Sequence, residues 1–319
     1  MAFTTRSLGQ NGPMVSAIGL GCMGMSEFYG EHDRKSSLAT IAAALEAGIT
    51  LFDTGDFYGM GHNEMLLAEA LKGRRERAFL QVKFGPQRHP NGAFIGYDAR
   101  PAAVKTALAY SLTRLNTDYV DLYQTGVDPN VPIEETIGAI GELVQTGYVR
   151  HIGIMNATAE MIRRAHATYP ITALQFEYSL MSRDIENDIL PLCRELGIGI
   201  TAYGVLSRGL LTGSRADGKK DVRKALLPRF QGENLARNER LAQALAEVAR
   251  DEGMTAAQAA MGWVASQGAD IIPLVGARTV QRLQEAIAAP LDLPESTLAK
   301  LEAAIPKDTV EGSRLMAAT

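Results

Sequence analysis

The stretch Phe52-Asp53-Thr54-Gly55-Asp56-Phe57-Tyr58-Gly59 follows an apolar run, residues 49–52, that is typical of a buried strand. At Asp53, the end of such a strand, the chain leaves the core and enters a loop at the opening of the fold. The Tyr58 side chain can fold back over the same opening. A second apolar strand, residues 79–83, ends in Lys83. If the two strands are parallel, Asp53, Tyr58 and Lys83 meet at their C-terminal ends.

These three residue types together indicate acid catalysis. A Lys ammonium near a phenol favours the phenolate and lowers the Tyr pKa from its reference of about 10. We therefore expect Lys83 to make Tyr58 a usable general acid at neutral pH, with Asp53 holding Lys83 charged and in place. Each residue alone has an ordinary structural explanation, because Asp often caps a helix and Lys is usually solvated, so only the joint arrangement indicates catalysis.

Composition narrows the class of protein. The 319 residues have a formal net charge of -4, which points to neither nucleic acid nor an acidic membrane surface as a partner. The two cysteines, Cys22 and Cys193, form no CxxC pair and no zinc spacing, which favours a reduced, intracellular setting. With no signal-like start and no apolar run long enough to span a bilayer, we expect a soluble, cytoplasmic, globular protein.

The N-terminal part offers two interpretations. Residues 4–15 contain an Asn11-Gly12-Pro13 turn between short runs, which predicts a hairpin before the main fold. Residues 19–24 match the G-x-G-x-x-G pattern of a dinucleotide-binding Rossmann fold. A Rossmann helix should begin inside the glycine run, yet residues 25–33 have no helical period, so a glycine-rich turn after the first strand is the favoured interpretation.

Strands and helices then alternate along the chain. Apolar runs that read as strands cover residues 49–52, 79–83, 119–123, 149–154, 198–203 and 271–275. We count roughly eight strands with helices between them, as parallel βα units require, and the short connections favour a closed (β/α)8 barrel over an open sheet. The prediction is one barrel domain over residues 1–319, with the longest irregular piece, residues 214–232, after the seventh strand.

Active sites of such barrels lie at the C-terminal ends of the strands. Polar residues and glycines expected there are Asp53, Tyr58, Lys83, Gln124, Gly126, Asn156, Gln175, Tyr203 and Gly276. The last unit also places Arg278 and Arg282 where a helix begins, against the helix dipole. A phosphate would relieve both arginines, and pairing with nearby acidic residues is the alternative that stays open.

Several longer stretches carry a family resemblance. They are Gly21-Cys22-Met23-Gly24, residues 53–59 with Gly61-His62-Asn63-Glu64, Asp121-Leu122-Tyr123-Gln124, Ala202-Tyr203 with Arg208-Gly209, and residues 228–234. Over nearly its whole length the chain resembles the aldo-keto reductases, in a subgroup without the usual catalytic His. That resemblance implies hydride transfer between a nicotinamide and a carbonyl carbon, with Tyr58 as proton donor, Lys83 tuning it and Asp53 supporting Lys83.

The resemblance also implies a cofactor site for NADPH (NADP+). Asn156 and Gln175 match the ligands of the carboxamide, Tyr203 matches the ring that stacks on the nicotinamide, and two arginines suit a 2′-phosphate. The full set of implied cofactor-binding residues is Gly24, Met25, Asp53, Asn156, Gln175, Tyr203, Leu206, Ser207, Arg208, Gly276, Arg278, Arg282 and Glu285.

Three positions depart from the family pattern. Gly126 stands where the family has its fourth catalytic residue, a His, and Met155 and Ala286 stand where a Ser and an Asn are usual. The substrate pocket is expected from Tyr29, Phe57, Gln124 and Gly126, and a missing imidazole predicts a roomy, partly aromatic pocket for a bulky or cyclic carbonyl compound.

Other functions remain to be weighed against carbonyl reduction. The missing His also suits a cofactor-binding regulatory protein with little turnover, like the potassium-channel β subunits of the same family. A short-chain dehydrogenase would need Tyr-x-x-x-Lys, which does not occur in the sequence. A metal-dependent hydrolase would need clustered His ligands at strand ends, so no metal is expected.

Overall fold

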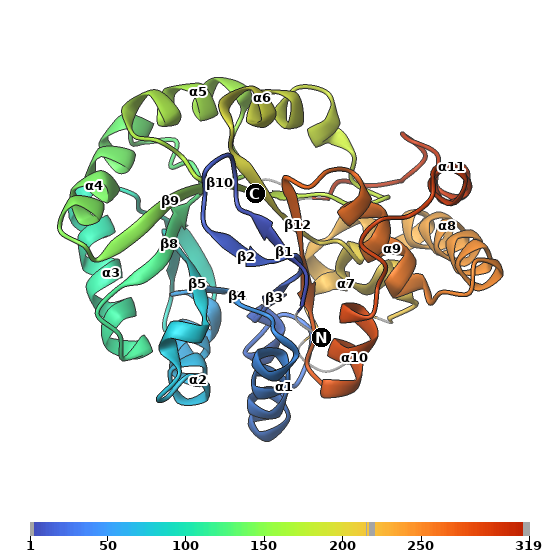
Figure 1. Cartoon of the computed structure of the whole chain (residues 1–319), viewed down its shortest axis with the longest axis horizontal. Coiled ribbons are helices and arrows are strands. Elements are labelled where there is room, and N and C mark those ends of the chain that lie inside the picture. The colour runs from blue at the N-terminus through green and yellow to red at the C-terminus, as the bar shows by residue number, and fades with distance from the viewer. Residues whose placement is uncertain (1–2, 215, 217–220, 315–319) are drawn as a thin grey trace.

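The computed structural model describes residues 3–214, 216 and 221–314. Within these residues, eight parallel strands form a closed barrel in which β12 pairs with β3 to complete the ring (Figure 1). The barrel strands are β3 (Gly19–Gly21), β4 (Leu51–Gly55), β5 (Phe79–Phe84), β8 (Val120–Thr125), β9 (Val149–Met155), β10 (Ala173–Glu177), β11 (Gly199–Tyr203) and β12 (Ile271–Gly276). The predicted (β/α)8 barrel is confirmed.

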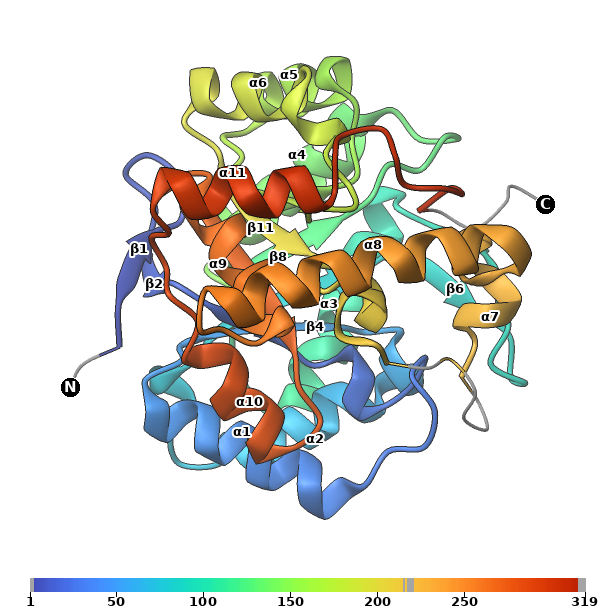
Figure 2. The same ribbon diagram turned by 90° about the vertical axis from the view of Figure 1, so that its right-hand side faces the viewer.

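Helices lie on the outside of the barrel, most of them between successive strands and the last two after the final strand (Figure 1). They are α1 (Arg34–Ala47), α2 (His62–Ala70), α3 (Pro101–Leu115), α4 (Ile133–Gln145), α5 (Ala159–Thr168), α6 (Ile189–Leu196), α7 (Arg223–Leu226), α8 (Gly232–Asp251), α9 (Ala256–Ser266), α10 (Val280–Ile287) and α11 (Glu295–Ala304). Their ends follow the sequence signals: Gly48 ends α1 in the left-handed conformation, and Thr255 with Gln258 forms the predicted capping box of α9. Helices α8 and α11 lie side by side outside the ring (Figure 2).

Two antiparallel hairpins accompany the barrel. The first, β1 (Thr5–Ser7) with β2 (Met14–Ser16), is the predicted hairpin and crosses the centre of the ring in Figure 1. The second, β6 (Pro86–Arg88) with β7 (Phe94–Tyr97), follows β5 and has a register shift at Gln87 and Arg88. The sequence analysis did not predict this second hairpin.

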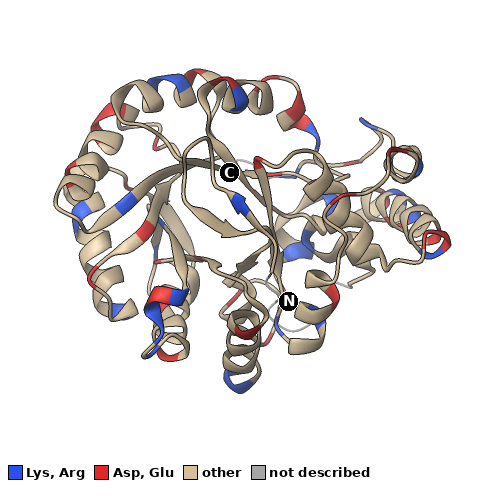
Figure 3. Ribbon diagram, viewed as in Figure 1, with Lys and Arg blue, Asp and Glu red and all other residues tan. Residues whose placement is uncertain are grey.

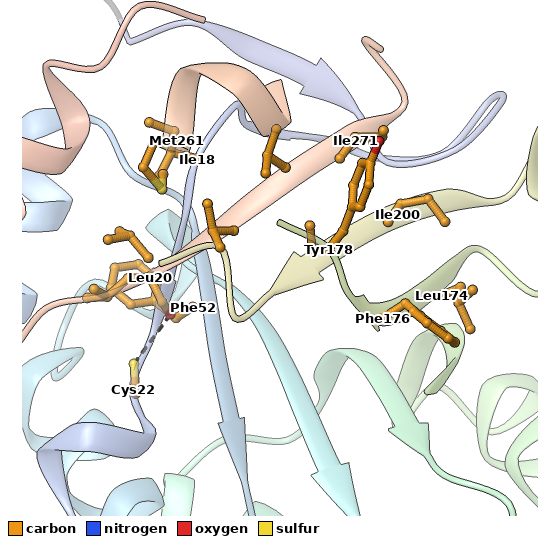
Figure 4. Packing of buried hydrophobic residues seen from close by; sticks show 14 of the residues in the cluster. Ile18, Leu20, Cys22, Phe52, Leu174, Phe176, Tyr178, Ile200, Met261 and Ile271 are labelled. Carbon is orange, nitrogen blue, oxygen red and sulfur yellow. Dashed lines mark hydrogen bonds between the residues drawn. The ribbon is translucent and has the colours of Figure 1, made fainter. Parts of the chain in front are cut away.

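The main hydrophobic core lies between the strands and the outer helices. Leu20 of β3 and Phe52 of β4 are paired neighbours on this face, and Ile18 lies near Met261 of α9 (Figure 4). Cys22 is buried, and its thiol donates to the carbonyl oxygen of Leu20, so it behaves as a packing residue. This layer fixes the strands whose C-terminal ends carry the site.

The fold settles the alternative interpretation of the glycine-rich stretch near the N-terminus. Residues 19–24 form β3 and the 3-10 helix Met23–Met25 with no α-helix starting in the glycine run, so the Rossmann interpretation is wrong. Acidic and basic residues alternate over the outer helices (Figure 3), in keeping with the small net charge. Among the described helices, none combines the length and apolar character that crossing a membrane requires.

Candidate active site

Asp53, Tyr58 and Lys83 come together at the C-terminal ends of β4 and β5. The Lys83 ammonium lies 2.5 Å from Asp53 Oδ1 and 4.9 Å from the centre of the Tyr58 ring. Asp53 Oδ2 accepts hydrogen bonds from Gln81 Nε2 at 2.8 Å and from Gln175 Nε2 at 2.7 Å. The carboxylate is therefore held by three donors, and its position fixes that of Lys83.

The loop that carries Tyr58 is tied to the barrel by Asn63. Thr54 Oγ1 donates to Asn63 Oδ1 at 2.7 Å, while Asn63 Nδ2 donates to the carbonyl oxygen of Cys22 and to Ser26 Oγ, each at 2.8 Å. Sequence reasoning used Asn63 only as a family marker, and the structure gives it the task of joining the β3 and β4 loops beneath Tyr58.

Burial dominates the protonation of the central pair. It raises the pKa of Tyr58 well above its ordinary value, with smaller contributions from Asp53 and Tyr29. It also lowers the pKa of Lys83, against the opposing effect of Asp53. We expected Lys83 to lower the Tyr58 pKa, and the structure differs because desolvation of the phenolate is the largest influence on this pKa and the nearby Asp53 carboxylate adds to it. The consequence is a phenol that stays protonated and can act as a donor.

The space expected at Gly126 is filled by Tyr97 from the β6–β7 hairpin. A Cβ atom at Gly126 would lie 3.0 Å from Tyr97 Oη, and the Gly126 amide donates to that oxygen at 2.6 Å. The space directly beside Gly126 is therefore not open, because a phenol from a distant segment lies against it, while the width of the pocket as a whole stays a prediction. Nothing in the local sequence around Gly126 signals this contact.

Gln124 lies inside the barrel and not on its rim. It is fully buried and in register with Lys83 on the neighbouring strand. Neither of its amide atoms has a hydrogen-bond partner within the described part of the chain. A substrate contact by Gln124 therefore stays a prediction, while its place beside Lys83 is established.

Tyr29 and Phe57, the other predicted pocket residues, lie on the loops over the mouth. Phe57 packs edge-on against Tyr58 with ring centres 4.8 Å apart, and Phe94 of β7 lies 6.2 Å from Phe57. Tyr29 forms an isolated β-bridge with Asp221, which joins the first βα loop to the long segment after β11. Aromatic rings thus lie together at this place, including Phe94, which sequence reasoning missed, and their role in lining a substrate pocket stays a prediction.

The residues expected around the nicotinamide lie on three adjacent strands, β9, β10 and β11. The Tyr203 hydroxyl donates to Asn156 Oδ1 at 3.0 Å, and Asn156 has a left-handed backbone with φ 51. Gln175 reaches Asp53, so one carboxylate links this side of the site to Lys83. Gln175, one of the two expected carboxamide ligands, is thus hydrogen-bonded to the carboxylate that also holds Lys83.

The residues expected at the pyrophosphate occupy a strained loop, Leu206 to Arg208. Ser207 and Arg208 both have positive φ, 46 and 57. Ser207 Oγ lies 3.1 Å from Ser179 Oγ, and Arg208 Nη2 lies 3.5 Å from Glu177 Oε2. Both polar side chains are therefore occupied by protein partners here, and strain of this kind is common where a loop contacts a ligand.

At the expected adenosine end, Arg278 is the central side chain. Its Nη1 donates to the carbonyl oxygens of Tyr29 at 2.8 Å and Glu31 at 3.0 Å. Burial lowers the pKa of Arg278, and repulsion by Arg282 and Arg223 lowers it further. The three arginines form a cationic cluster near the start of α10, which Asp221 partly neutralises through its ion pair with Arg223.

The remaining candidates have simpler positions. Gly24 lies against Arg278, since a Cβ there would be 3.6 Å from the arginine Cδ, and Gly276 faces open space. Met25 is fully buried, so its side chain belongs to the core. Glu285 accepts a hydrogen bond from Gln258 through its carbonyl oxygen. Among the described residues, no group of three His, Cys, Asp or Glu side chains could hold a metal ion.

Comparisons with known proteins identify the family of the chain. The model of the Aldo/keto reductase family matches residues 17–306. The chain is 40% identical over 315 residues to "Probable aldo-keto reductase 1" of Glycine max, covering 96% of this chain and 90% of the relative.

Solved structures of the same family have similar folds. The glycerol dehydrogenase of Gluconobacter oxydans gives a TM-score of 0.86 at 28% identity, covering 98% of both chains. An aldo/keto reductase of Klebsiella pneumoniae, solved with NADP and acetate, gives 0.75 at 26% identity and covers 98% of this chain and 99% of its own. The chain belongs to the aldo/keto reductase family and is an oxidoreductase.

Proposed function

We propose that this chain catalyses the reversible reduction of an aldehyde or ketone to an alcohol, with NADPH as hydride donor and Tyr58 as proton donor. The observation that carries the proposal is the buried contact between Lys83 and Asp53 beside the Tyr58 ring. An ammonium, a carboxylate and a phenol buried together at strand ends are costly for stability, and such clusters concentrate at functional sites.

The residues present fit NADPH. The cationic cluster of Arg223, Arg278 and Arg282 suits a phosphate, because their mutual repulsion would be relieved by it. Asn156 and Tyr203 offer an amide and a ring on the side of the barrel that the Gln175–Asp53 hydrogen bond connects to Lys83. When bound, NADPH would supply a hydride to the carbonyl carbon.

The chain's own groups handle the proton. Tyr58 Oη, kept protonated by burial, donates to the substrate oxygen as that oxygen gains negative charge. The phenolate that this leaves is stabilised by the buried Lys83 ammonium near its ring. Asp53, fixed by Gln81 and Gln175, keeps that ammonium charged against desolvation.

The substrate loses one donor relative to the family pattern. With Gly126 in place of an imidazole, no side chain at that position can hydrogen-bond the carbonyl oxygen. Losing one such donor costs roughly 10²–10³ in rate in oxyanion-type sites. Reactive aldehydes and quinone-like carbonyls need less polarisation, so we propose them as the substrate class ahead of small unactivated ketones.

Cofactor preference tests the cationic cluster. Charge-assisted contacts to a phosphate contribute about 1.5–3 kcal/mol each. The double variant Arg278→Ala/Arg282→Ala should therefore bind NADPH more weakly by about tenfold or more, and NADH almost as before. Equal losses for both cofactors, measured by fluorescence titration, would show that the arginines serve the fold or the pyrophosphate.

The central experiment is a panel of carbonyl substrates with NADPH and with NADH. Loss of absorbance of the reduced nicotinamide is followed for a reactive aldehyde, a quinone and a small ketone. We expect turnover of the first two with NADPH, and the small ketone should react poorly. Tight NADPH binding without turnover on any substrate would instead support the low-turnover regulatory alternative.

A further inference from the structure

Tyr97 joins the ends of two barrel strands that flank Lys83. Its hydroxyl accepts the Gly126 amide at 2.6 Å, lies 2.8 Å from Thr125 Oγ1 and donates to the carbonyl oxygen of Phe84 at 3.2 Å. The ring lies so close over Gly85 that a Cβ there would be 2.5 Å from it. A side chain from the β6–β7 hairpin thus bridges the C-terminal ends of β5 and β8.

Gly126 is a glycine for reasons of packing. Its backbone φ lies outside the positive range that disfavours other residues, yet a Cβ would be 3.0 Å from Tyr97 Oη and 3.5 Å from Cζ. The first distance is tighter than ordinary contact, and the second is ordinary. The hydroxyl of Tyr97 is therefore the atom that a side chain at position 126 would have to displace.

The same hairpin forms an aromatic wall over the proton donor. Phe94 lies 6.2 Å from Phe57, which packs 4.8 Å from the ring of Tyr58. Arg88 of β6 bonds Glu27 at 2.6 Å and places its guanidinium 4.1 Å from the Phe94 ring. The wall is thus fixed from one side by Arg88 and at its base by Tyr97.

We propose that Tyr97 is a positioning residue of the carbonyl site: its hydroxyl packs against Gly126 and locks the β6–β7 hairpin as an aromatic wall that orients carbonyl compounds with a flat apolar ring toward Tyr58. This inference rests on the proposed carbonyl reduction. Burial raises the pKa of Tyr97 to about 12, which keeps the hydroxyl neutral throughout the working range.

The consequence of losing the hydroxyl follows from these contacts. In Tyr97→Phe the Gly126 amide loses its acceptor, so the hairpin loses its anchor at the base while the aromatic ring remains. The hydrogen bonds of the Tyr97 hydroxyl go to Phe84, Thr125 and Gly126 and not to Tyr58, Lys83 or Asp53, so the proton-donating machinery stays intact. Substrate positioning should weaken, and the chemical step should change little.

Tyr123→Phe is the matched control. Tyr123 is a fully buried tyrosine of β8 whose hydroxyl donates to the carbonyl oxygen of Val104, away from the hairpin. We expect Tyr97→Phe to raise KM for an aromatic aldehyde by about tenfold with kcat changed by less than about threefold, and to affect acetaldehyde much less. Tyr123→Phe should leave both KM values unchanged.

A double-mutant cycle isolates the packing. Gly126→Ala should lower kcat/KM in the parent, where its methyl meets Tyr97 Oη, and should be tolerated in the Tyr97→Phe background, where only the ring remains. Additive effects of the two substitutions would overturn the inference. The quantity to compare is the ratio of kcat/KM for the aromatic aldehyde to kcat/KM for acetaldehyde. This ratio does not depend on how much of each variant is folded.

Hydrogen–deuterium exchange gives a readout independent of turnover. Backbone amides of residues 86–97 should exchange faster in Tyr97→Phe and at the parental rate in Tyr123→Phe. Unchanged exchange would overturn the role of Tyr97 whatever the kinetics. A parent without turnover would contradict the proposed function alone, whereas an active parent with equal KM shifts in both variants would contradict only the inference about Tyr97.

Discussion

The two ends of the barrel interior are built by the same strands and differ in chemistry. At the N-terminal end, Leu51 and Leu122 pack with residues of the β1–β2 hairpin in a closed apolar cluster. Two positions further along the same strands, on the same face, stand Asp53 and Gln124. The same strands therefore fill the barrel with apolar side chains at one end and with charged and amide side chains at the other.

The difference shows where stability and function reside. Apolar burial at the closed end stabilises the fold by roughly 25 cal/mol per Å². At the other end the Lys83 ammonium is desolvated, and amide atoms of Gln81 and Gln124 lack partners among the described residues. Each unpartnered buried polar atom costs about 1–3 kcal/mol. The closed end offsets the cost of the polar end, so substitutions at the two ends should have opposite signatures.

The largest expected effect is at the polar end, in Tyr58→Phe. The change removes the hydroxyl and keeps the ring, so carbonyl reduction should fall by about 10²–10⁴-fold. NADPH affinity and thermal stability should stay near those of the parent. Steady-state kinetics with a reactive aldehyde and a fluorescence titration measure the two properties. Tyr110→Phe, at an exposed tyrosine of α3, is the control that should retain full activity. Near-parental turnover of Tyr58→Phe would reassign the proton donor.

The corresponding change at the closed end is Leu122→Ala, which should affect stability and not activity. Leu122 is fully buried beneath the catalytic layer, and removing its side chain should lower the free energy of unfolding by about 2–5 kcal/mol. KM for NADPH and the aldehyde should change little. Urea unfolding measures the loss, with Met65→Ala, at an exposed apolar side chain of α2, as a control without a cavity. A large rise in KM from Leu122→Ala would show that the two ends are not independent.

Much of the barrel and of its polar end could be predicted from the sequence, because the signals lie within a few residues of one another. The apolar run ending in Asp53 and the one ending in Lys83 place their last residues at one mouth once the strands are parallel. The turn of the first hairpin and the capping box of Thr255 with Gln258 are likewise signals within a few residues. Such patterns predicted the barrel and brought the central three residues together.

What the sequence did not predict depends on distance or burial. Tyr97 reaches Gly126 across 29 positions through a hairpin with an irregular register, and no local pattern specifies that contact. The direction of the Tyr58 pKa was also not predicted, because the residue types suggested a stabilising Lys83 charge while the degree of desolvation follows only from the packed structure. Gln81 is a further example, since its role in holding Asp53 follows from strand register.

The smallest expected effect is a pH dependence of stability. It arises from Asp56, in the loop above the polar end of the barrel. Burial raises the pKa of Asp56 from its ordinary 3.8 to about 7, and the neighbouring Glu64 carboxylate adds to the shift, opposed by Arg114 and by the Phe57 amide. The folded chain then holds this proton more tightly than the unfolded chain, so stability falls as pH rises from 3.8 to about 7.

Asp56→Asn keeps the group neutral at every pH and should remove this loss. Because Asp56 is partly exposed to solvent, we expect the variant to be more stable than the parent near pH 8 by about 1–2 kcal/mol, less than the full shift implies, with the difference shrinking toward zero as pH falls to about 4. Thermal unfolding across that range measures it. Asp98→Asn is the contrasting control, because hydrogen bonds from Arg100 lower the pKa of Asp98, so its neutralisation should remove a small stabilisation at neutral pH. If Asp56→Asn and Asp98→Asn change stability in the same direction near pH 8, the charged Asp56 carboxylate is not the group that destabilises the polar end.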